Sequence, residues 1–182
     1  MGINVIPNMK PGILKNHPYR KVFEQYDAFV KTPDKAEDYV GRWWGGEGRF
    51  VDFTKKAGRD AWKELLKKNL MAKGMRTVWN DNCEYDGVED RNAYCDHEGM
   101  GGTMAELKII QSNMMAYTGK EALKRSISKK RDLTFINRAG YAGIQRYAQV
   151  LGRRQLNRLE NREIQHCYHY GHGIVRNVQC RM

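Results

Sequence analysis

The feature that most constrains the fold is an alternation of short apolar segments with amphipathic helical segments over residues 1–150. The clearest helix is predicted from Thr54, a candidate N-cap, to Lys73, and Gly74 is typical of a helix C-terminal stop. The apolar residues of this helix recur at helical spacing on one face: Ala61, Trp62, Leu65, Leu66 and Leu70. A second helix is predicted to open at a capping box over residues 103–106 and to run to about residue 126.

Strand-like segments lie between these helices. Strands are predicted at residues 3–6, 49–53, 75–79 and 133–136, and weaker helices at residues 18–30 and 142–150. The Gly-rich segment 43–48 and the acidic segment 85–102 are predicted as loops. This order is typical of an α/β fold with parallel strands, in which functional side chains gather beyond the carboxyl ends of the strands. Two polar clusters, at residues 80–84 and 137–140, follow predicted strands and are therefore candidate sites.

The composition fits a folded protein of one domain's size. Hydrophobic residues make up 41% and aromatic residues 10% of the 182 residues, which excludes a wholly disordered chain. The four cysteines are too few for a dense disulfide framework in a chain of this length. No apolar run approaches the roughly 18 residues of a membrane span, and the N-terminal residues show no signal-peptide pattern. We therefore expect a cytoplasmic protein with no membrane partner.

The formal net charge of +11 raises the alternative of a basic nucleic-acid-binding protein. Residues 151–182 hold six Arg and two Glu, so this Arg/His-rich tail contributes +4 and leaves +7 for residues 1–150. A further basic run lies at residues 129–131. Such patches bind phosphates without sequence preference, but no nucleic-acid-binding motif accompanies them. A solvated surface is therefore the favoured interpretation, and no nucleic-acid partner is predicted.

Two groups of Cys and His residues have the chemistry of zinc ligands. They are Cys83, Cys95 and His97, and Cys167, His169, His172 and Cys180. The first group matches no strong zinc spacing, and the second lacks the apolar periodicity that normally holds such ligands in place. Ordinary loop residues are the favoured interpretation of both groups, so no metal and no cofactor is predicted.

Three carboxylates, Asp81, Glu84 and Asp86, cluster just past the strand predicted at residues 75–79. Carboxylates in a pocket can act as nucleophile, general base or metal ligands. The alternative is that they cap the following loop, and the residue pattern alone leaves both interpretations open. The neighbouring Trp79 favours a site, because an aromatic ring beside a carboxylate at a strand end suits stacking against a sugar.

The motifs around these residues resemble glycoside hydrolase family 31, a family of retaining α-glucosidases and α-xylosidases on a (β/α)8 barrel. Residues 79–84, WNDNCE, resemble the family's W-x-D-x-N-E nucleophile signature. Residues 50–54, FVDFT, resemble its P-D-F-T-N-P segment. Residues 137–147, NRAGYAGIQRY, resemble its R-[SA]-x…G-x-x-R-[YWF] segment. Two departures are Cys83, where the family usually has Asn, and Val51, where it usually has Pro.

The resemblance implies a role for each of five residues. Asp81 is expected to be the nucleophile, and Glu84 is expected to support the site rather than react. Trp44 and Trp79 are expected to line the first sugar subsite, and Arg138 is expected to bind the sugar or orient the carboxylates. The implied substrate is an α-glucoside or an α-xyloside, and the implied fold is the middle part of a TIM barrel.

The family's acid/base Asp is expected soon after Arg146, in a W-x-G-D-N segment. Residues 150–155 read VLGRRQ and contain no acid. A one-base shift of the reading frame near codon 151 permits the text W-A-G-D-N-L-T-D-W, which resembles the family's continuation. We therefore predict a fragment of the catalytic domain at residues 1–150, followed by an out-of-frame, disordered tail at residues 151–182. Without the acid/base residue, the isolated chain is expected to be inactive or nearly so.

Overall fold

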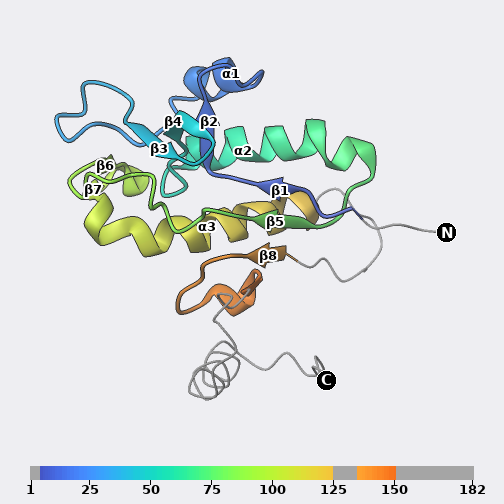
Figure 1. The fold of residues 1–182 in the computed structure, drawn as a ribbon. Helices are drawn as coiled ribbons and strands as arrows, with labels where there is room; N and C mark the ends of the chain where they lie inside the picture. Colours follow the sequence, from blue (N-terminus) through green and yellow to red (C-terminus); the bar gives the residue numbers. More distant parts are fainter. Residues whose placement is uncertain (1–4, 125–134, 151–182) are drawn as a thin grey trace.

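The computed structural model describes residues 5–124 and 135–150 (Figure 1). The helices are α1 (Arg20–Gln25), α2 (Lys56–Asn69) and α3 (Met104–Lys124), with short 3-10 helices η1 (Met71–Lys73), η2 (His97–Gly99) and η3 (Ile144–Arg146). The strands are β1 (Asn8–Met9), β2 (Gly12–Leu14), β3 (Val40–Trp43), β4 (Gly46–Phe50), β5 (Val78–Asn80), β6 (Tyr94–Cys95), β7 (Gly102–Thr103), β8 (Phe135–Asn137) and β9 (Gln149–Val150).

A four-stranded sheet in the order β1-β5-β8-β9 carries the candidate site. Each of its strand pairs is parallel, which confirms the predicted α/β class. The pairs set Asn8 beside Trp79, Trp79 beside Ile136, and Ile136 beside Gln149. Within the described ranges the sheet is open, as in part of a barrel, with β1 and β9 at its two edges. Figure 1 shows β1, β5 and β8 side by side.

The two faces of this sheet differ in how far they are covered. Val78, Asn80, Phe135 and Asn137 are buried on the face toward α3. The Asn137 amide donates to the backbone carbonyl of Ser112 in α3 at 3.3 Å, which ties that face to the helix. On the opposite face, residues of the other register row are only half-buried or exposed: Asn8, Trp79, Ile136 and Gln149. Among the described residues, the face that carries Asn8, Trp79, Ile136 and Gln149 is therefore the less covered one, and it is called the open face below.

A three-stranded antiparallel sheet, in the order β2-β4-β3, lies beside β1. The Gly-rich segment 43–48, predicted as a loop, is for the most part the hairpin of β3 and β4, with Trp44 and Gly45 between the strands. The prediction was wrong because Gly, which usually weakens a strand, also occurs in strands where another part of the backbone approaches closely. A Cβ added to Gly48 would lie 2.6 Å from the Ile13 carbonyl oxygen, so Gly is needed where β2 and β4 approach closely.

The best predicted helix is confirmed, but its N-cap is not the predicted residue. α2 begins at Lys56 after Lys55, and Thr54 instead donates its hydroxyl to the Asp52 carboxylate at 2.6 Å. The predicted stop at Gly74 is confirmed, since Gly74 ends η1 directly after α2 in the left-handed conformation, with φ of 79°. One half of the predicted capping box at residues 103–106 is present, because the Glu106 carboxylate accepts from the Thr103 backbone N–H at 2.9 Å. The Thr103 hydroxyl also donates to Glu106, at 2.9 Å.

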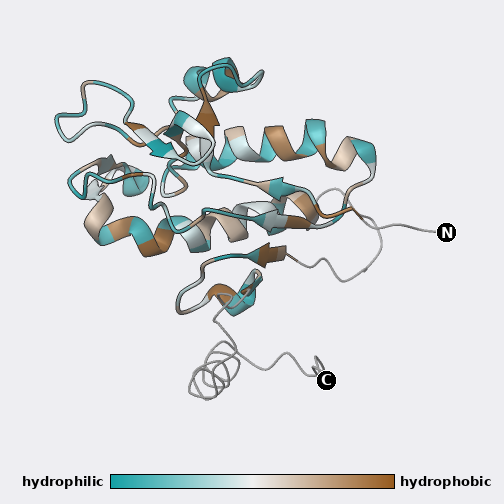
Figure 2. Cartoon of the chain, in the orientation of Figure 1, coloured by the Kyte–Doolittle hydropathy of each residue, from teal (hydrophilic) through white to brown (hydrophobic). Residues whose placement is uncertain are grey.

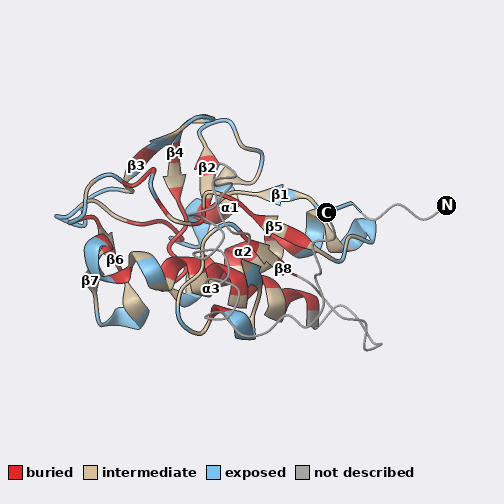
Figure 3. Cartoon of the chain, turned by 60° about the horizontal axis from the view of Figure 1, so that its bottom comes forward, coloured by how far each residue is buried: buried red, intermediate tan, exposed pale blue. Residues whose placement is uncertain are grey.

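The hydrophobic core lies where α2 and α3 pack together and against the sheets (Figure 3). The predicted apolar face of α2 is buried, with Leu70 at its end half-buried. Hydrophilic residues occupy much of the remaining surface of this helix (Figure 2). Gly58 allows the first turn of α2 to approach the chain before it, because a Cβ there would lie 2.1 Å from the Asp52 carbonyl oxygen.

Several predicted boundaries differ from the observed ones. Residues 142–150, predicted as a helix, form η3 and then β9, because Gly143 adopts φ of 92° and the chain turns back to pair with β8. The first strand, β1, lies at residues 8–9 and not at 3–6: residues 5 and 6 are not in a strand, and residues 3 and 4 lie outside the described residues. The segment 85–102, predicted as loop, contains β6, η2 and the start of β7.

Some sequence-based predictions concern residues that the structure does not describe. These are the tail at residues 151–182, the zinc-ligand group Cys167, His169, His172 and Cys180, and the basic run at residues 129–131. Among the helices that are described, none is both long and apolar enough to cross a membrane.

Candidate active site

The candidate site is a row of three charged residues just beyond the carboxyl ends of β1, β5 and β8. Met9, Asn80 and Asn137 are register partners in the three strands, and Lys10, Asp81 and Arg138 each follow one of them. The backbone pairing continues into this row, since the Asp81 N–H donates to the Met9 carbonyl at 2.8 Å and the Arg138 N–H donates to the Asn80 carbonyl at 2.9 Å. The sheet register therefore places one carboxylate between two cations.

Both oxygens of the Asp81 carboxylate are engaged. Oδ2 accepts from Lys10 Nζ at 3.1 Å and from Asn8 Nδ2 at 3.2 Å. Oδ1 accepts from Arg138 Nη1 at 3.2 Å and from the Asn82 backbone N–H at 3.0 Å. The side chain is only 12% exposed, so these donors fix the carboxylate in one orientation.

This environment keeps Asp81 ionised. Partial burial acts to raise the pKa of Asp81, because removing water from around a carboxylate disfavours its charge. Hydrogen bonds from Lys10 and Asn8, the positive charge of Lys10 and the Asn82 N–H act in the other direction and outweigh it. The net pKa of Asp81 lies below its ordinary value, so the group is an anion at neutral pH.

Glu84 joins the same cluster through Arg138. Nη2 of Arg138 donates to Oε1 of Glu84 while Nη1 donates to Asp81, so one guanidinium links the two carboxylates. Three buried polar atoms in this segment have no hydrogen-bond partner among the described residues: Trp79 Nε1, Asn82 Oδ1 and Glu84 Oε2. Buried polar atoms in folded proteins are nearly always paired, so these three atoms are available to a ligand, to water or to a further part of the protein.

A buried polar layer holds the site from behind. Asn80 donates to the Asn137 side-chain oxygen at 2.8 Å, which links β5 to β8. The Cys83 sulfur accepts from the Ala139 N–H at 3.3 Å, and burial raises the pKa of this thiol. Asn82 has φ of 52°, a left-handed conformation that turns the chain sharply after Asp81. These contacts fix the loops after β5 and β8 relative to each other.

The two predicted sugar-platform residues lie at different parts of the site. Trp79, in β5, faces the open side of the sheet in the same row as Asn8 and Ile136. Trp44 lies at the turn of the β3–β4 hairpin and is 79% exposed. It reaches the Asp81 cluster through Lys10, whose Nζ lies 5.0 Å from the centroid of the Trp44 ring.

The structure thus brings together Asp81, Glu84 and Arg138 directly, and Trp44 through Lys10. Two residues of the cluster, Asn8 and Lys10, were missed by sequence reasoning. The first strand was predicted five residues too early, so both residues fell outside it. With β1 at its observed position, the rule that sites lie beyond the carboxyl ends of parallel strands would have identified Lys10.

Other candidate residues have structural partners away from this cluster. Asp86 is exposed and pairs with Lys108 at 2.7 Å. Cys95 accepts from Gln111 Nε2 at 3.4 Å, and its burial raises the pKa of the thiol to about 12. Cys83 and Cys95 are free thiols, and the described residues contain no group of His, Cys, Asp and Glu arranged to hold a metal.

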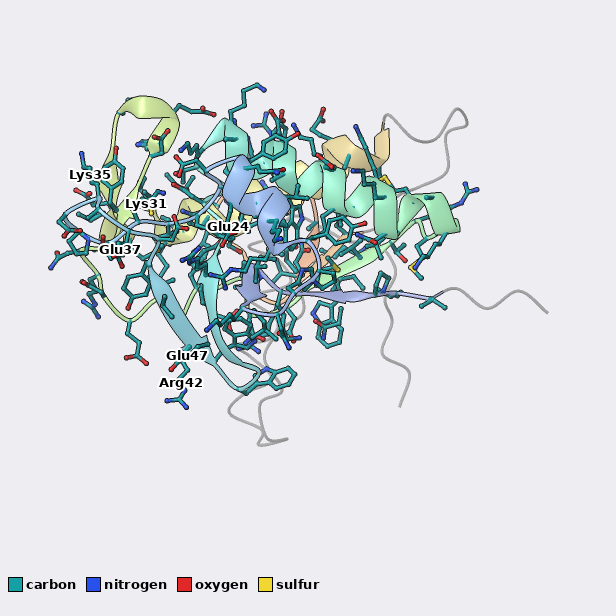
Figure 4. The ribbon with its side chains drawn as sticks, turned by 90° about the horizontal axis from the view of Figure 1, so that it is seen from above. Glu24, Lys31, Lys35, Glu37, Arg42 and Glu47 are labelled. Atoms are coloured by element: carbon teal, nitrogen blue, oxygen red, sulfur yellow. The ribbon has the colours of Figure 1, made fainter. Side chains whose placement is uncertain are left out.

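A cleft of about 150 Å³ has Lys31, Lys35 and Lys55 in its lining. Lys31 and Lys35 come from the same loop and are labelled in Figure 4. These lysines already have partners, since Lys31 pairs with Asp27 at 2.5 Å and Lys35 lies 4.1 Å from the centre of the Tyr94 ring. In the same view, Arg42 and Glu47 project from the β3–β4 hairpin, where they are register partners. The cleft is therefore an ion-paired surface feature, distinct from the Asp81 cluster.

Comparisons with known proteins agree on one family. The model of the glycosyl hydrolases family 31 TIM-barrel domain matches residues 1–152. Alpha-glucosidase 2 of Bacillus thermoamyloliquefaciens is 32% identical over 159 residues, which is 82% of this chain and 19% of that protein.

Solved structures of the same family share the fold. A dextranase of Flavobacterium johnsoniae, solved in complex with glucose, matches 80% of this chain with a TM-score of 0.69 and 27% identity. An α-xylosidase from a soil metagenome, complexed with xylose, matches 81% with a TM-score of 0.68 and 22% identity, a likeness of fold. The chain spans about a fifth of the length of these proteins, 18% and 21% respectively.

Proposed function

The chain belongs to glycosyl hydrolases family 31, and from that membership we propose that it is part of a retaining α-glycosidase whose nucleophile is Asp81. The observation that carries this proposal is the ionised Asp81 carboxylate at the carboxyl end of β5, fixed between Lys10 and Arg138. A nucleophilic carboxylate has to be charged and aimed before the substrate binds, and both conditions are met by its four donors.

The chemistry proceeds in two steps. An oxygen of Asp81 attacks the anomeric carbon, the glycosidic C–O bond breaks, and its electron pair goes to the leaving oxygen, which takes a proton from a general acid. In the second step, water attacks the anomeric carbon, its proton goes to the conjugate base of that general acid, and the bond between the sugar and Asp81 breaks to release the carboxylate. Glu84 is on the same loop as Asp81 and is held by Arg138, so its role is to keep Arg138 in place.

The general acid is not among the residues described around Asp81. Lys10 and Asn8 contact Asp81, while Arg138 contacts Asp81 and Glu84, so the described cluster contributes the nucleophile and its supports. The unpaired polar atoms of Trp79, Asn82 and Glu84 support the view that the rest of the site, including the general acid, comes from elsewhere. Their partners are the sugar hydroxyls and the parts of the barrel that the relatives contain and this chain does not span.

The substrate is an α-glucoside or an α-xyloside. The names of the relatives favour glucose, since one is an alpha-glucosidase and another is a dextranase solved with glucose and with isomaltotriose. Trp79 supports a sugar on the open face of the sheet, because an indole ring offers an apolar surface to the C–H face of a pyranose.

The proposal is tested with a reagent that needs no general acid. A ring-fluorinated α-glucosyl fluoride carries a leaving group that departs without a proton, so the missing acid does not prevent ester formation. We expect mass spectrometry to show one added glycosyl group on the peptide that contains Asp81, and no such group in Asp81→Asn. The matched control is Asp86→Asn, which removes an exposed carboxylate of the same loop and is expected to label like the wild type. Label on another residue, or equal labelling in Asp81→Asn, would contradict the proposal.

The alternative of nucleic-acid binding rests on residues 151–182 and 129–131. Both segments lie outside the described residues, and the described part of the chain adds no observation in its favour.

A further inference from the structure

Lys10 makes three contacts that meet at one ammonium group. Nζ donates to Asn8 Oδ1 at 2.7 Å and to Asp81 Oδ2 at 3.1 Å, and it lies 5.0 Å from the centroid of the Trp44 ring. An ammonium has three protons to donate, so these three contacts account for its capacity. The side chain is 19% exposed, which leaves little room for competing water.

The backbone on both sides of Lys10 is anchored. On one side, the Asp81 N–H donates to the Met9 carbonyl at 2.8 Å, which pairs β1 with the residue after β5. On the other side, the Val51 N–H donates to the Pro11 carbonyl at 3.0 Å, which ties the chain to the end of β4. Lys10 therefore stands at a fixed point between the parallel sheet that carries Asp81 and the antiparallel sheet that carries Trp44.

Taking the proposed function as the premise, we propose that Lys10 is a positioning residue that holds the nucleophile Asp81 and the Trp44 ring in a fixed relation. Each of the two cations in the row takes one oxygen of the carboxylate: Lys10 takes Oδ2 and Arg138 takes Oδ1. This division sets the rotation of the carboxylate about its Cβ–Cγ bond. It also sets which oxygen is directed toward the hairpin and which toward β8.

Lys10 also sets the orientation of the Asn8 amide. The amide oxygen of Asn8 accepts from Lys10 while its nitrogen donates to Asp81, so the amide, the ammonium and the carboxylate form a closed triangle. Without the ammonium, the amide oxygen has no partner that favours this orientation. Loss of Lys10 therefore weakens the Asn8 contact to Asp81 as well as its own.

The Trp44 end depends on Lys10 even more. Trp44 is 79% exposed, and in the described part of the chain its contact with a charged group or ring is the one with Lys10. The neighbouring Trp43 packs against Phe50, with ring centroids 5.3 Å apart, and does not need the cation. A cation over an indole face is attracted by the ring's quadrupole, which orients an otherwise free side chain.

The test compares three variants of the whole chain: Lys10→Met, Lys10→Arg and Lys15→Met. Methionine keeps the unbranched stem and removes the charge, while arginine keeps the charge. Lys15 is an exposed lysine near Lys10 in sequence, so Lys15→Met controls for the loss of one positive charge. Two NMR readouts are followed: the carboxyl carbon shift of Asp81 against pH, with Glu84 observed alongside, and the indole N–H signal of Trp44, assigned with Trp44→Phe.

In Lys10→Met we expect the Asp81 titration midpoint to move up and the Trp44 indole signal to shift toward that of a free, solvated indole. Lys10→Arg should restore most of both readouts, and Lys15→Met should change neither. A purely structural role of Lys10 would not move the titration of Asp81 in a chain that remains folded. An Asp81 midpoint and a Trp44 signal that are the same in Lys10→Met, Lys15→Met and the wild type would overturn the proposal.

A wild-type measurement covers the case in which Lys10→Met does not fold. The side-chain carbon next to the Lys10 ammonium should report the ionisation of Asp81, with a shift whose midpoint coincides with that of the Asp81 carboxyl. No such coupled shift would overturn the proposal. Failure of the proposed function has a separate signature, the absence of a glycosyl label on Asp81, which neither titration measures.

Discussion

Arg138 lies beside Asp81 with Nη1 of its guanidinium 3.2 Å from the carboxylate Oδ1, although the two residues are far apart in sequence. Each residue follows the last residue of its strand, and the two strands are paired in register. The contact is therefore a product of strand pairing, and it exists only when β5 and β8 are correctly aligned.

Replacing Arg138 should lower stability and expose how Glu84 is held. In Arg138→Met, the half-buried carboxylate of Glu84 loses its cation and Asp81 loses a donor, so we expect a loss of about 1 kcal/mol in the free energy of unfolding, measured with urea. Arg138→Lys should recover only part of this, because an ammonium cannot make the two-pronged contact. Arg91→Met removes an exposed arginine elsewhere and should leave the free energy of unfolding unchanged. An equal loss of stability in Arg91→Met would show that the change in net charge, and not the contacts of Arg138, is the cause.

The pH dependence of stability should carry the signature of Asp81. Its folded-state pKa is lowered, so it stabilises the fold above its unfolded-state pKa, and that contribution is lost as pH falls through the folded-state value. At neutral pH the wild type should have a higher urea midpoint than Asp81→Asn, and the two midpoints should converge below about pH 4, near the ordinary pKa of an aspartate. A wild type that gains stability relative to Asp81→Asn on acidification would show that the pKa of Asp81 is raised in the folded chain.

Asp52 should prove essential to the fold. It is buried and accepts four hydrogen bonds, from the Thr54 N–H at 2.9 Å, the Thr54 hydroxyl at 2.6 Å, Gln111 at 2.8 Å and the Asp96 N–H at 2.7 Å. Asp52→Ala leaves these buried donors unpaired, and we expect a loss of about 3 kcal/mol or more, visible as a lower urea midpoint or as an unfolded circular dichroism spectrum. Asp86→Ala, at an exposed carboxylate, is the matched control and should change stability little.

The isolated chain should turn over aryl α-glycosides at or near the uncatalysed rate. General acid catalysis typically contributes about 10²–10⁴-fold, and no acid stands opposite Asp81 among the described residues. The measurement is release of the aryl group with time, for the wild type and for Asp81→Asn. Clear turnover that depends on Asp81 would mean that the chain holds a working acid in residues that the structure does not describe.

The sequence was sufficient to predict the local features of the fold. The apolar face of α2, the Gly74 stop and the Thr103–Glu106 contact depend on neighbours within one or two turns, and the structure contains all three. The parallel arrangement also followed from the alternation of helices and strands. Family resemblance then identified Asp81, Glu84 and Arg138, which the structure places in one cluster.

What the sequence did not predict depends on contacts between distant segments. Two-residue strands such as β1 and β9 are too short to show a periodicity, and they exist because β5 and β8 offer paired edges. Thr54 looks like an N-cap, but its hydroxyl is taken by Asp52 and by the His97 N–H. Asn8 and Lys10 join the site for the same reason, since their distance from Asp81 is set by register alone.

The row Lys10–Asp81–Arg138 has a consequence for the order of events in folding. None of the contacts in this row can form within a local helix or turn, because each needs a parallel pairing between strands that are far apart in the sequence. Such non-local contacts form slowly in folding. During refolding, the ionisation of Asp81 should therefore reach its native behaviour after α2 and α3 have formed. The time at which the Asp81 carboxyl reaches its native pKa therefore reports when the pairing of β1, β5 and β8 is complete.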